Sequence, residues 1–150
     1  MNPLLKLLIF VLMIVIAVFI YGRLQGSRST DFNEMMQPTE SPFPECPDTP
    51  NCVRISVPLA QPTSRLYILT MDAIENLEPV EIESNLDELR FEAVFETPVF
   101  GFRDDLLIKI DGEDRNHILH IRSASHTGYS DLGVNRRRVQ KLVRLIRERL

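Results

Sequence analysis

The most continuous apolar stretch of the chain runs from Leu4 to Gly22, with Lys6 as its single charge. No polar face is present from Leu7 to Tyr21, whereas a helix at the surface of a soluble core keeps one. As a helix, this stretch would span roughly 28 Å, close to the hydrocarbon thickness of a bilayer. The pattern predicts a transmembrane anchor over residues 1–22.

Cleavage of this segment as a secretory signal would require small residues immediately before the cut and three positions before it. Ile20 with Gly22, and Leu24 with Gly26, fail at the earlier position, so we expect an uncleaved, single-pass anchor. Counting basic residues on the two sides favours an inward domain. The cysteine pair described below favours the periplasmic or extracytoplasmic side, and we expect that orientation.

Residues 23–62 are rich in Pro, Ser, Thr and Asn, and seven of them are prolines, which disfavour helix and interior strand. The composition predicts a linker over residues 23–45, followed by an ordered loop. From residue 46 to the C-terminus at 150 we expect one folded domain.

Within that domain, apolar residues recur at helical spacing from Ser64 to about Leu77, and Thr63 is placed to cap the helix. Alternating apolar and polar residues predict a hairpin over residues 80–95 and a second over residues 106–123. A last helix is expected from near Asp131, with Val139, Leu142, Val143, Ile146 and Leu150 on one stripe.

Strands joined by short turns pair antiparallel, and helices at the two ends of such a series cover one face of the sheet. The predicted fold is therefore α+β: a two-layer sandwich with a four-stranded, mainly antiparallel sheet. An N-terminal and a C-terminal helix flank the sheet, and the transmembrane helix precedes them.

Composition agrees with one globular domain, since 44% of the 150 residues are hydrophobic and 25% are charged. The net charge of -4 conceals an uneven distribution: acids dominate residues 72–114, and bases dominate from Asn135 onward. The basic helix has no interleaved aromatics, so nucleic acid is not an expected partner. A solvated helix, or one that contacts anionic lipid, remains open.

The two cysteines lie in Cys46-Pro-Asp-Thr-Pro-Asn-Cys52, where prolines and an asparagine can fold the chain back on itself. A disulfide is the favoured interpretation, with two free thiols as the alternative. A metal site has little support, because two cysteines without nearby ligands do not complete a coordination shell. No metal is expected.

Other motifs give little indication of chemistry. No glycine-rich phosphate loop is present, so no cofactor is expected. His117, His120 and His126 lack the spacing of metal ligands. Asp104 and Asp105 are adjacent in a predicted strand and therefore point to opposite faces. We expect a structural role for Asp105, as acceptor of a hydrogen bond from Arg122 on the neighbouring strand.

The densest polar run is Ile121-Arg-Ser-Ala-Ser-His-Thr-Gly-Tyr-Ser-Asp-Leu-Gly-Val-Asn-Arg136. Together with Cys46-Pro-Asp-Thr-Pro-Asn-Cys52-Val53 and Phe102-Arg-Asp-Asp105, it resembles the bacterial and plastid proteins grouped as domain of unknown function 1499. The resemblance covers approximately Cys46 to the end. His126 stands where the family usually has arginine. No activity follows from the resemblance.

Two interpretations of this run stay open. A structural one uses Asp131 as a helix cap, Gly128 and Gly133 as turn residues, and Asn135 as a backbone partner. A functional one makes the run a polar pocket that grips an anionic ligand, with Asp105 orienting Arg122. The candidate binding residues are Asp105, Arg122, Ser123, Ser125, Tyr129, Asp131, Asn135 and Arg136.

We therefore predict a non-enzymatic membrane protein of the cell envelope that binds a lipid, a small molecule or an envelope protein through the run from Arg122 to Arg136. The alternative is a hydrolase or transferase that uses Asp105 or Asp131 as general base and a loop serine as nucleophile. The sequence shows no histidine and acid placed to activate such a serine.

Overall fold

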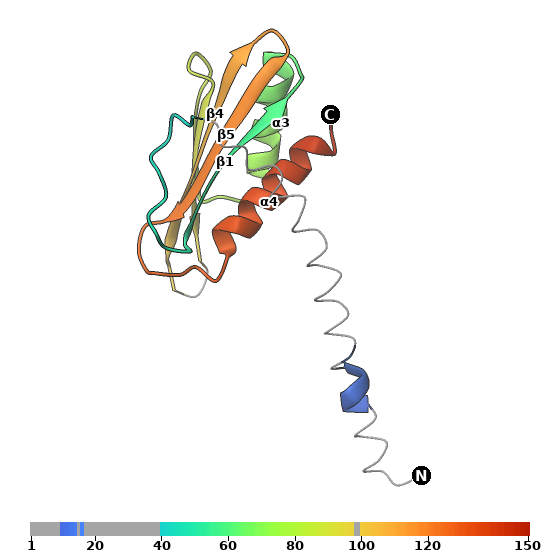
Figure 1. Ribbon diagram of the computed structural model, residues 1–150, viewed down its shortest axis with the longest axis vertical. Coiled ribbons are helices and arrows are strands. Elements are labelled where there is room, and N and C mark those ends of the chain that lie inside the picture. Colours follow the sequence, from blue (N-terminus) through green and yellow to red (C-terminus); the bar gives the residue numbers. More distant parts are fainter. Residues whose placement is uncertain (1–9, 15, 17–39, 98–99) are drawn as a thin grey trace. The chain divides into compact units, whose positions relative to one another are not determined.

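The computed structural model describes residues 10–14, 16, 40–97 and 100–150 (Figure 1). The chain divides into two compact units, residues 1–35 and residues 36–150. In the first unit, residues 10–14 and 16 are helical. Within the described residues, no helix has the length and apolar character needed to cross a membrane. Most of the predicted anchor and linker falls outside the described residues and stays a prediction.

The second unit contains five strands and two helices, and its strands form one antiparallel sheet in the order β1-β5-β4-β3-β2. Helices α3 and α4 cover one face of that sheet (Figure 1). The α+β class and the two flanking helices are as predicted. The elements are β1 (Cys52–Leu59), α3 (Thr63–Glu75), β2 (Glu81–Asn85), β3 (Arg90–Glu96), β4 (Arg103–Glu113), β5 (Asn116–Ser125) and α4 (Val134–Arg147).

The predicted count of four strands is wrong, because Cys52–Leu59 forms β1 instead of a loop. Strand β1 lies at one edge of the sheet and pairs only with β5. At an edge, Pro58 is tolerated because one side of the strand needs no ladder hydrogen bond. Ile55, Val57 and Leu59 alternate toward the core, and this alternation is the pattern that the proline content concealed.

Both predicted hairpins are confirmed, as β2–β3 and β4–β5. Both helices also form, but their starts differ from expectation. Pro62 rather than Thr63 occupies the N-cap of α3, and the Thr63 hydroxyl lies 2.8 Å from Nε2 of His117. Helix α4 begins at Val134 and not near Asp131, since Gly133 in the left-handed region (φ 76°) turns the chain into it.

The core lies between the sheet and the helices, where alternate residues of each strand point inward. Its contacts bury aromatic and branched side chains almost completely, which supplies the main free energy of folding. Tyr67 of α3 packs on Phe91 of β3 with ring centroids 4.7 Å apart. The largest fully buried apolar side chains are Leu66, Ile74, Phe91, Leu106, Ile108, Ile110, Leu119, Ile121, Leu142 and Ile146.

The opposite side of the sheet, the outer face, is partly covered by the segment that precedes β1 (Figure 1). Phe43 of this segment is only 4% exposed. Arg54 of β1 donates a hydrogen bond from Nη1 to the Phe43 carbonyl at 3.1 Å, and the Arg90 guanidinium lies 5.7 Å from the ring centroid. The covering segment is therefore held by outer-face side chains of two strands, β1 and β3.

The predicted disulfide is confirmed: Cys46 and Cys52 are bonded, with their Cα atoms 5.6 Å apart. The bond closes a short loop between the covering segment and the start of β1. It consequently fixes where the chain enters the sheet.

Candidate functional site

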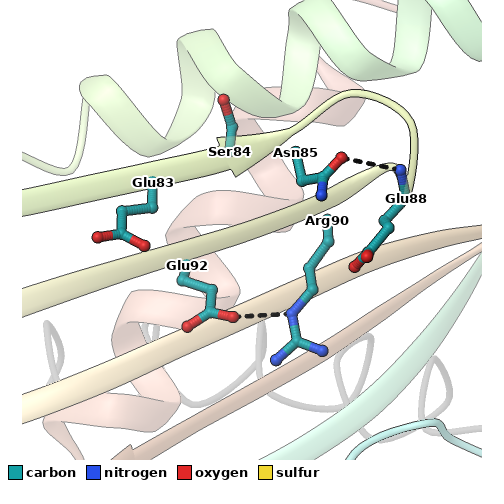
Figure 2. Close-up of a pocket in the computed structure, with 6 residues that line it drawn as sticks. All are labelled: Glu83, Ser84, Asn85, Glu88, Arg90 and Glu92. Carbon is teal, nitrogen blue, oxygen red and sulfur yellow. Dashed lines mark hydrogen bonds and ion pairs between the residues drawn. The ribbon is translucent and has the colours of Figure 1, made fainter.

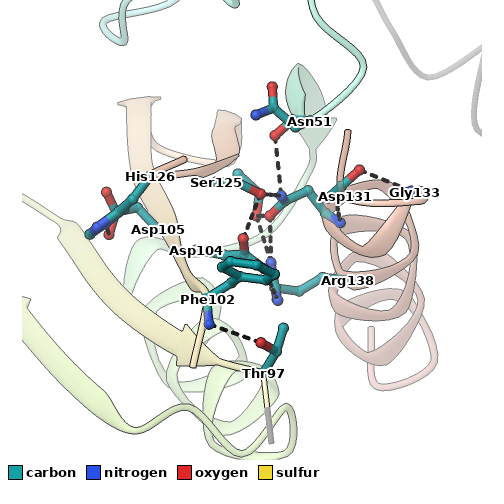
Figure 3. A network of polar contacts seen from close by, with 12 residues as sticks. Asn51, Thr97, Phe102, Asp104, Asp105, Ser125, His126, Asp131, Gly133 and Arg138 are labelled. Carbon is teal, nitrogen blue, oxygen red and sulfur yellow. Dashed lines mark hydrogen bonds and ion pairs between the residues drawn. The ribbon is translucent and has the colours of Figure 1, made fainter. Parts of the chain in front are cut away.

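A network of polar side chains lies where the sheet meets the start of α4 (Figure 3). We call it the inner network; its members come from β4, β5, α4 and the residue before β1. The alternation of β4 and β5 directs these strand side chains inward, under the helix. The members are Asn51, Asp104, Ser123, Ser125, Asn135 and Arg138.

A buried ion pair forms the centre of the inner network. Arg138 Nη2 lies 2.8 Å from Asp104 Oδ2, and the two side chains are 10% and 4% exposed. The guanidinium also stacks over the ring of Phe95, with its central carbon 4.2 Å from the centroid. Ser125 donates its hydroxyl proton to the second Asp104 oxygen at 2.6 Å. Both charges are thus satisfied by protein groups, as burial requires.

Asn135 joins this ion pair to the rest of the fold. Its side-chain oxygen accepts hydrogen bonds from Ser123 Oγ at 2.6 Å and from Arg138 Nη1. Its nitrogen donates to the Asn51 carbonyl at 3.2 Å and to Ser125 Oγ at 3.0 Å. The amide therefore uses its full hydrogen-bonding capacity within the protein.

The loop between β5 and α4, residues 126–133, is attached to the inner network at its base. Asn51 Nδ2 donates to the Gly128 carbonyl at 2.6 Å. Asp131 accepts hydrogen bonds from the backbone N–H groups of Gly133, at 2.9 Å, and Asn135, at 2.6 Å. Asp131 thereby satisfies amides at the start of α4, which is a capping role exercised from two residues before the N-cap.

The structure brings only part of the predicted site together. Ser123, Ser125 and Asn135 meet in the inner network, but Arg122 lies on the outer face, since neighbouring strand residues point in opposite directions. Asp105 lies opposite Ala124 and pairs with His126 at 2.7 Å; the expected bond from Arg122 is not formed. The binding role of these residues stays a prediction.

The remaining predicted residues occupy different environments. Tyr129 is exposed in the loop, and Arg136 is half-buried in the first turn of α4. Asp131 is engaged by the start of α4, as described above. No single pocket collects all of the predicted residues.

Sequence reasoning missed Asp104 and Arg138 as partners. Asp104 shares its strand phase with Leu106 and Ile108, so the alternation that predicted the strand also places its carboxylate on the buried face. Arg138 directly precedes buried Val139 and lies four residues before buried Leu142. A cation so close to the apolar stripe of a helix indicates a buried carboxylate partner.

The loop end of the sheet, formed by residues 97, 100–102 and 126–133, exposes several large apolar side chains. The two loops are adjacent, because the His126 N–H donates to the Arg103 carbonyl at 2.9 Å. Phe100 and Phe102 stack with centroids 5.6 Å apart. Tyr129 and Leu132 are 72% and 85% exposed. These four side chains lie in adjacent loops, and the inner network holds the base of the second loop through the hydrogen bond from Asn51 to the Gly128 carbonyl.

The outer face contains a second polar group around His120. Its Nδ1 lies 2.8 Å from Ser56 Oγ, and its Nε2 lies 3.4 Å from Asp111 Oδ2. Burial lowers the pKa of His120, against the opposing attraction of Asp111 and together with the repulsion of Lys109. The three residue types are those of a hydrolase triad, yet Ser56 is 2% exposed and cannot meet a substrate in this conformation.

A shallow cavity of about 300 Å³ lies at the β2–β3 hairpin (Figure 2). Arg90 Nε forms an ion pair with Glu92 there at 2.8 Å. The side-chain oxygen of Asn85 accepts hydrogen bonds from the backbone N–H groups of Asp87 and Glu88. Glu83 and Glu88 add further negative charge to its lining. Three glutamates against one arginine make the cavity unfavourable for anions. In the part of the chain that is described, no cluster of His, Cys, Asp and Glu suits a metal ion.

Comparison with known proteins agrees with the resemblance in sequence. No curated protein matches the chain. Similar solved structures include protein CV1439 from Chromobacterium violaceum, with 12% identity and a TM-score of 0.39, and DR_A0006 from Deinococcus radiodurans, with 17% and 0.37. Each comparison covers 65% of this chain and 95% of the other. The family model described as protein of unknown function (DUF1499) matches residues 43–146, so the chain belongs to that family.

Proposed function

We propose that the protein is a non-enzymatic, membrane-anchored binding module of the cell envelope, and that its loop end binds a lipid surface. In this proposal residues 1–22 cross the bilayer, and the domain from Cys46 lies on the extracytoplasmic side. The apolar stretch from Leu4 to Gly22 supports the anchor. The Cys46–Cys52 disulfide supports the oxidising side.

The observation that carries the proposal is the exposure of Tyr129 and Leu132 on a fixed base. Exposed apolar side chains gathered on one surface are typical of interaction sites. Aromatic residues are enriched where membranes meet water, because their rings are apolar and their edges polar. Exposed Arg137, which donates to the Leu132 carbonyl at 2.8 Å, adds a cation suited to anionic headgroups.

The engagement of the loop serines supports a non-enzymatic role. Ser123 donates to Asn135 and Ser125 to Asp104, and no histidine among the described residues contacts either hydroxyl. Asp131 is committed to the start of α4, and Asp105 to His126. A nucleophile needs an adjacent base that is free to take its proton. The hydrolase or transferase alternative thus has no observation in its favour.

The proposal is tested on the full chain in lipid nanodiscs, with an environment-sensitive dye on Leu132→Cys. We expect a blue shift of the dye emission that grows with the fraction of anionic lipid and disappears in the Tyr129→Ser background. The control is the same dye on Leu86→Cys, an exposed position in the β2–β3 turn at the other end of the sheet. Equal spectra at the two positions would contradict lipid contact, and a shift that requires added envelope protein would assign the loop end to a protein partner.

A further inference from the structure

The outer face of the sheet carries four cations at neighbouring register positions: Arg54, Arg122, Lys109 and Arg90. Arg54 of β1 lies directly opposite Arg122 of β5. In the next row, Lys109 of β4 lies between His120 and Arg90. Directly opposed strand residues have Cβ atoms about 5 Å apart, and like charges at that spacing destabilise a sheet. The pair Arg54 and Arg122 therefore needs compensating negative charge.

The carboxylates of this face do not supply that charge to Arg122. Arg90 is paired with Glu92 at 2.8 Å, and Lys109 with Asp111 at 3.2 Å. Among the described residues, none forms an ion pair with Arg122, and its Nε is buried without a hydrogen-bond partner. Arg122 is thus a partly buried cation with an unused donor.

Arg54 is only weakly compensated. Its carboxylate partner, Glu45, lies 3.4 Å away and is 88% exposed, so water screens the attraction. The hydrogen bond from Arg54 Nη1 to the Phe43 carbonyl fixes the direction of the guanidinium without adding negative charge. The covering segment therefore fixes the direction of Arg54, the register partner of Arg122, and supplies only the screened charge of Glu45.

We propose that Arg54 and Arg122 form a binding site for a phosphate-type oxyanion on the outer face of the sheet. The planar guanidinium matches the geometry of a phosphate group, and charge-assisted hydrogen bonds of this kind are shorter and stronger than neutral ones. A bound oxyanion turns the repulsion between the two arginines into attraction for a shared ligand. Free phosphate and a phosphorylated headgroup present the same chemistry to this site, which is separate from the loop end.

The test is a titration of the detergent-solubilised full chain with inorganic phosphate at constant ionic strength. Isothermal titration calorimetry measures the affinity. We expect Arg122→Gln and Arg54→Gln each to weaken binding by about tenfold or more, because each removes a charge-assisted contact. Arg122→Lys, which keeps the charge but loses the planar donor set, falls between wild type and Arg122→Gln. Arg147→Gln, an exposed change in α4, leaves the affinity within about twofold. Circular dichroism of each variant verifies the fold.

A phosphate affinity unchanged in Arg122→Gln, or absent in the wild type, would overturn the site. If Arg122→Gln does not fold, the phosphate affinities of Arg54→Gln and Arg122→Lys test the site, and affinities equal to that of the wild type would overturn it. Nanodiscs distinguish the two sources: if lipid that contains phosphatidic acid or phosphatidylcholine displaces phosphate, the source is a headgroup, and if neither lipid displaces it, the source is the free ion. Because calorimetry in micelles does not involve Leu132, failure of this site and failure of lipid contact at the loop end are separate results.

Discussion

Two arginine sites, one on each face of the sheet, solve the problem of polar burial in opposite ways. On the helix-covered face, the inner network matches Asp104, Arg138 and Asn135 with partners on every side. On the outer face, Arg122 retains a buried donor without a partner. Each face has an arginine at β5: Arg138 contacts Ser123 on the helix-covered face, and Arg122 belongs to the strand on the outer face. The residue type alone therefore does not distinguish a structural role from a binding role. What separates them is whether the protein itself completes the hydrogen bonds.

The difference follows from the element that covers each face. Helix α4 closes the inner network because Asn135 and Arg138 lie on neighbouring turns and face the same strand side chains. Within the part of the chain that the structure describes, the outer face has no helix, and the segment with Phe43 covers part of it. A covering segment without regular structure leaves some polar groups for solvent or ligand.

The sharpest way to break this comparison is Asp104→Ala. The change leaves the Arg138 charge buried without its carboxylate, and we expect the free energy of unfolding to fall by about 3 to 5 kcal/mol. Denaturation of the full chain in urea, followed by circular dichroism, measures it. The control Glu148→Ala removes an exposed ion pair with Arg144 and costs less than about 0.5 kcal/mol. A loss below about 1 kcal/mol for Asp104→Ala would show that the inner network is not structural.

The outer face is tested next by Phe43→Ala. The ring is nearly fully buried, so its removal lowers the free energy of unfolding by about 3 kcal/mol. Thermal unfolding compares it with Leu86→Ala, which removes an exposed side chain and changes stability by less than about 0.5 kcal/mol. If the two variants melt together, the covering segment contributes nothing to the fold.

Removing the disulfide tests how firmly the covering segment is attached. The double change Cys46→Ser and Cys52→Ser opens a loop with a sequence separation of 6. On the chain-entropy model it lowers the free energy of unfolding by about 2 kcal/mol. Hydrogen exchange should quicken at residues 46–51 while β4 stays protected. Uniform loss of protection would instead make the bond part of the core.

The smallest expected effect concerns pH. Burial lowers the pKa of His120, so the unfolded chain binds a proton more readily than the folded one. Stability is therefore full above the unfolded pKa of about 6.5 and falls as the pH decreases toward the folded pKa. Between pH 7.5 and 5.5 we expect wild type to lose up to about 1 kcal/mol more than His120→Gln in urea unfolding. If the free energies of unfolding of wild type and His120→Gln change equally with pH, His120 does not cause the pH dependence of stability.

The sequence predicted the hairpins well, because Phe91, Ala93 and Phe95 alternate with polar residues where one face of a strand is buried. It missed β1 because proline disfavours interior strands, and nothing local shows that Cys52–Leu59 lies at an edge. The position of a strand in a sheet is set by pairing with distant residues. That information is absent from a local pattern.

The candidate site shows the same limit. Ser123, Ser125 and Asn135 lie close in sequence and are hydrogen-bonded to one another in the fold, while their predicted binding role stays a prediction. Because strand side chains alternate between faces, Arg122 faces away from Ser123, and one pocket cannot contain both side chains. Asn51 could not be found, because only the folded chain brings it within reach of Asn135 across 84 positions.

The pairing of β1 with β5 has a consequence during biosynthesis. Ser56 and His120 meet across the sheet although 64 positions separate them in the chain. At translation rates of about 5 to 20 residues per second, β1 waits several seconds for its partner strand to be made. Through that interval the ring closed by Cys46 and Cys52 is a local contact already available to the new strand, as is the hydrogen bond from Arg54 to the Phe43 carbonyl. Oxidation of that cysteine pair can therefore precede completion of the sheet. Ribosome-stalled chains of increasing length would show which of the two events comes first.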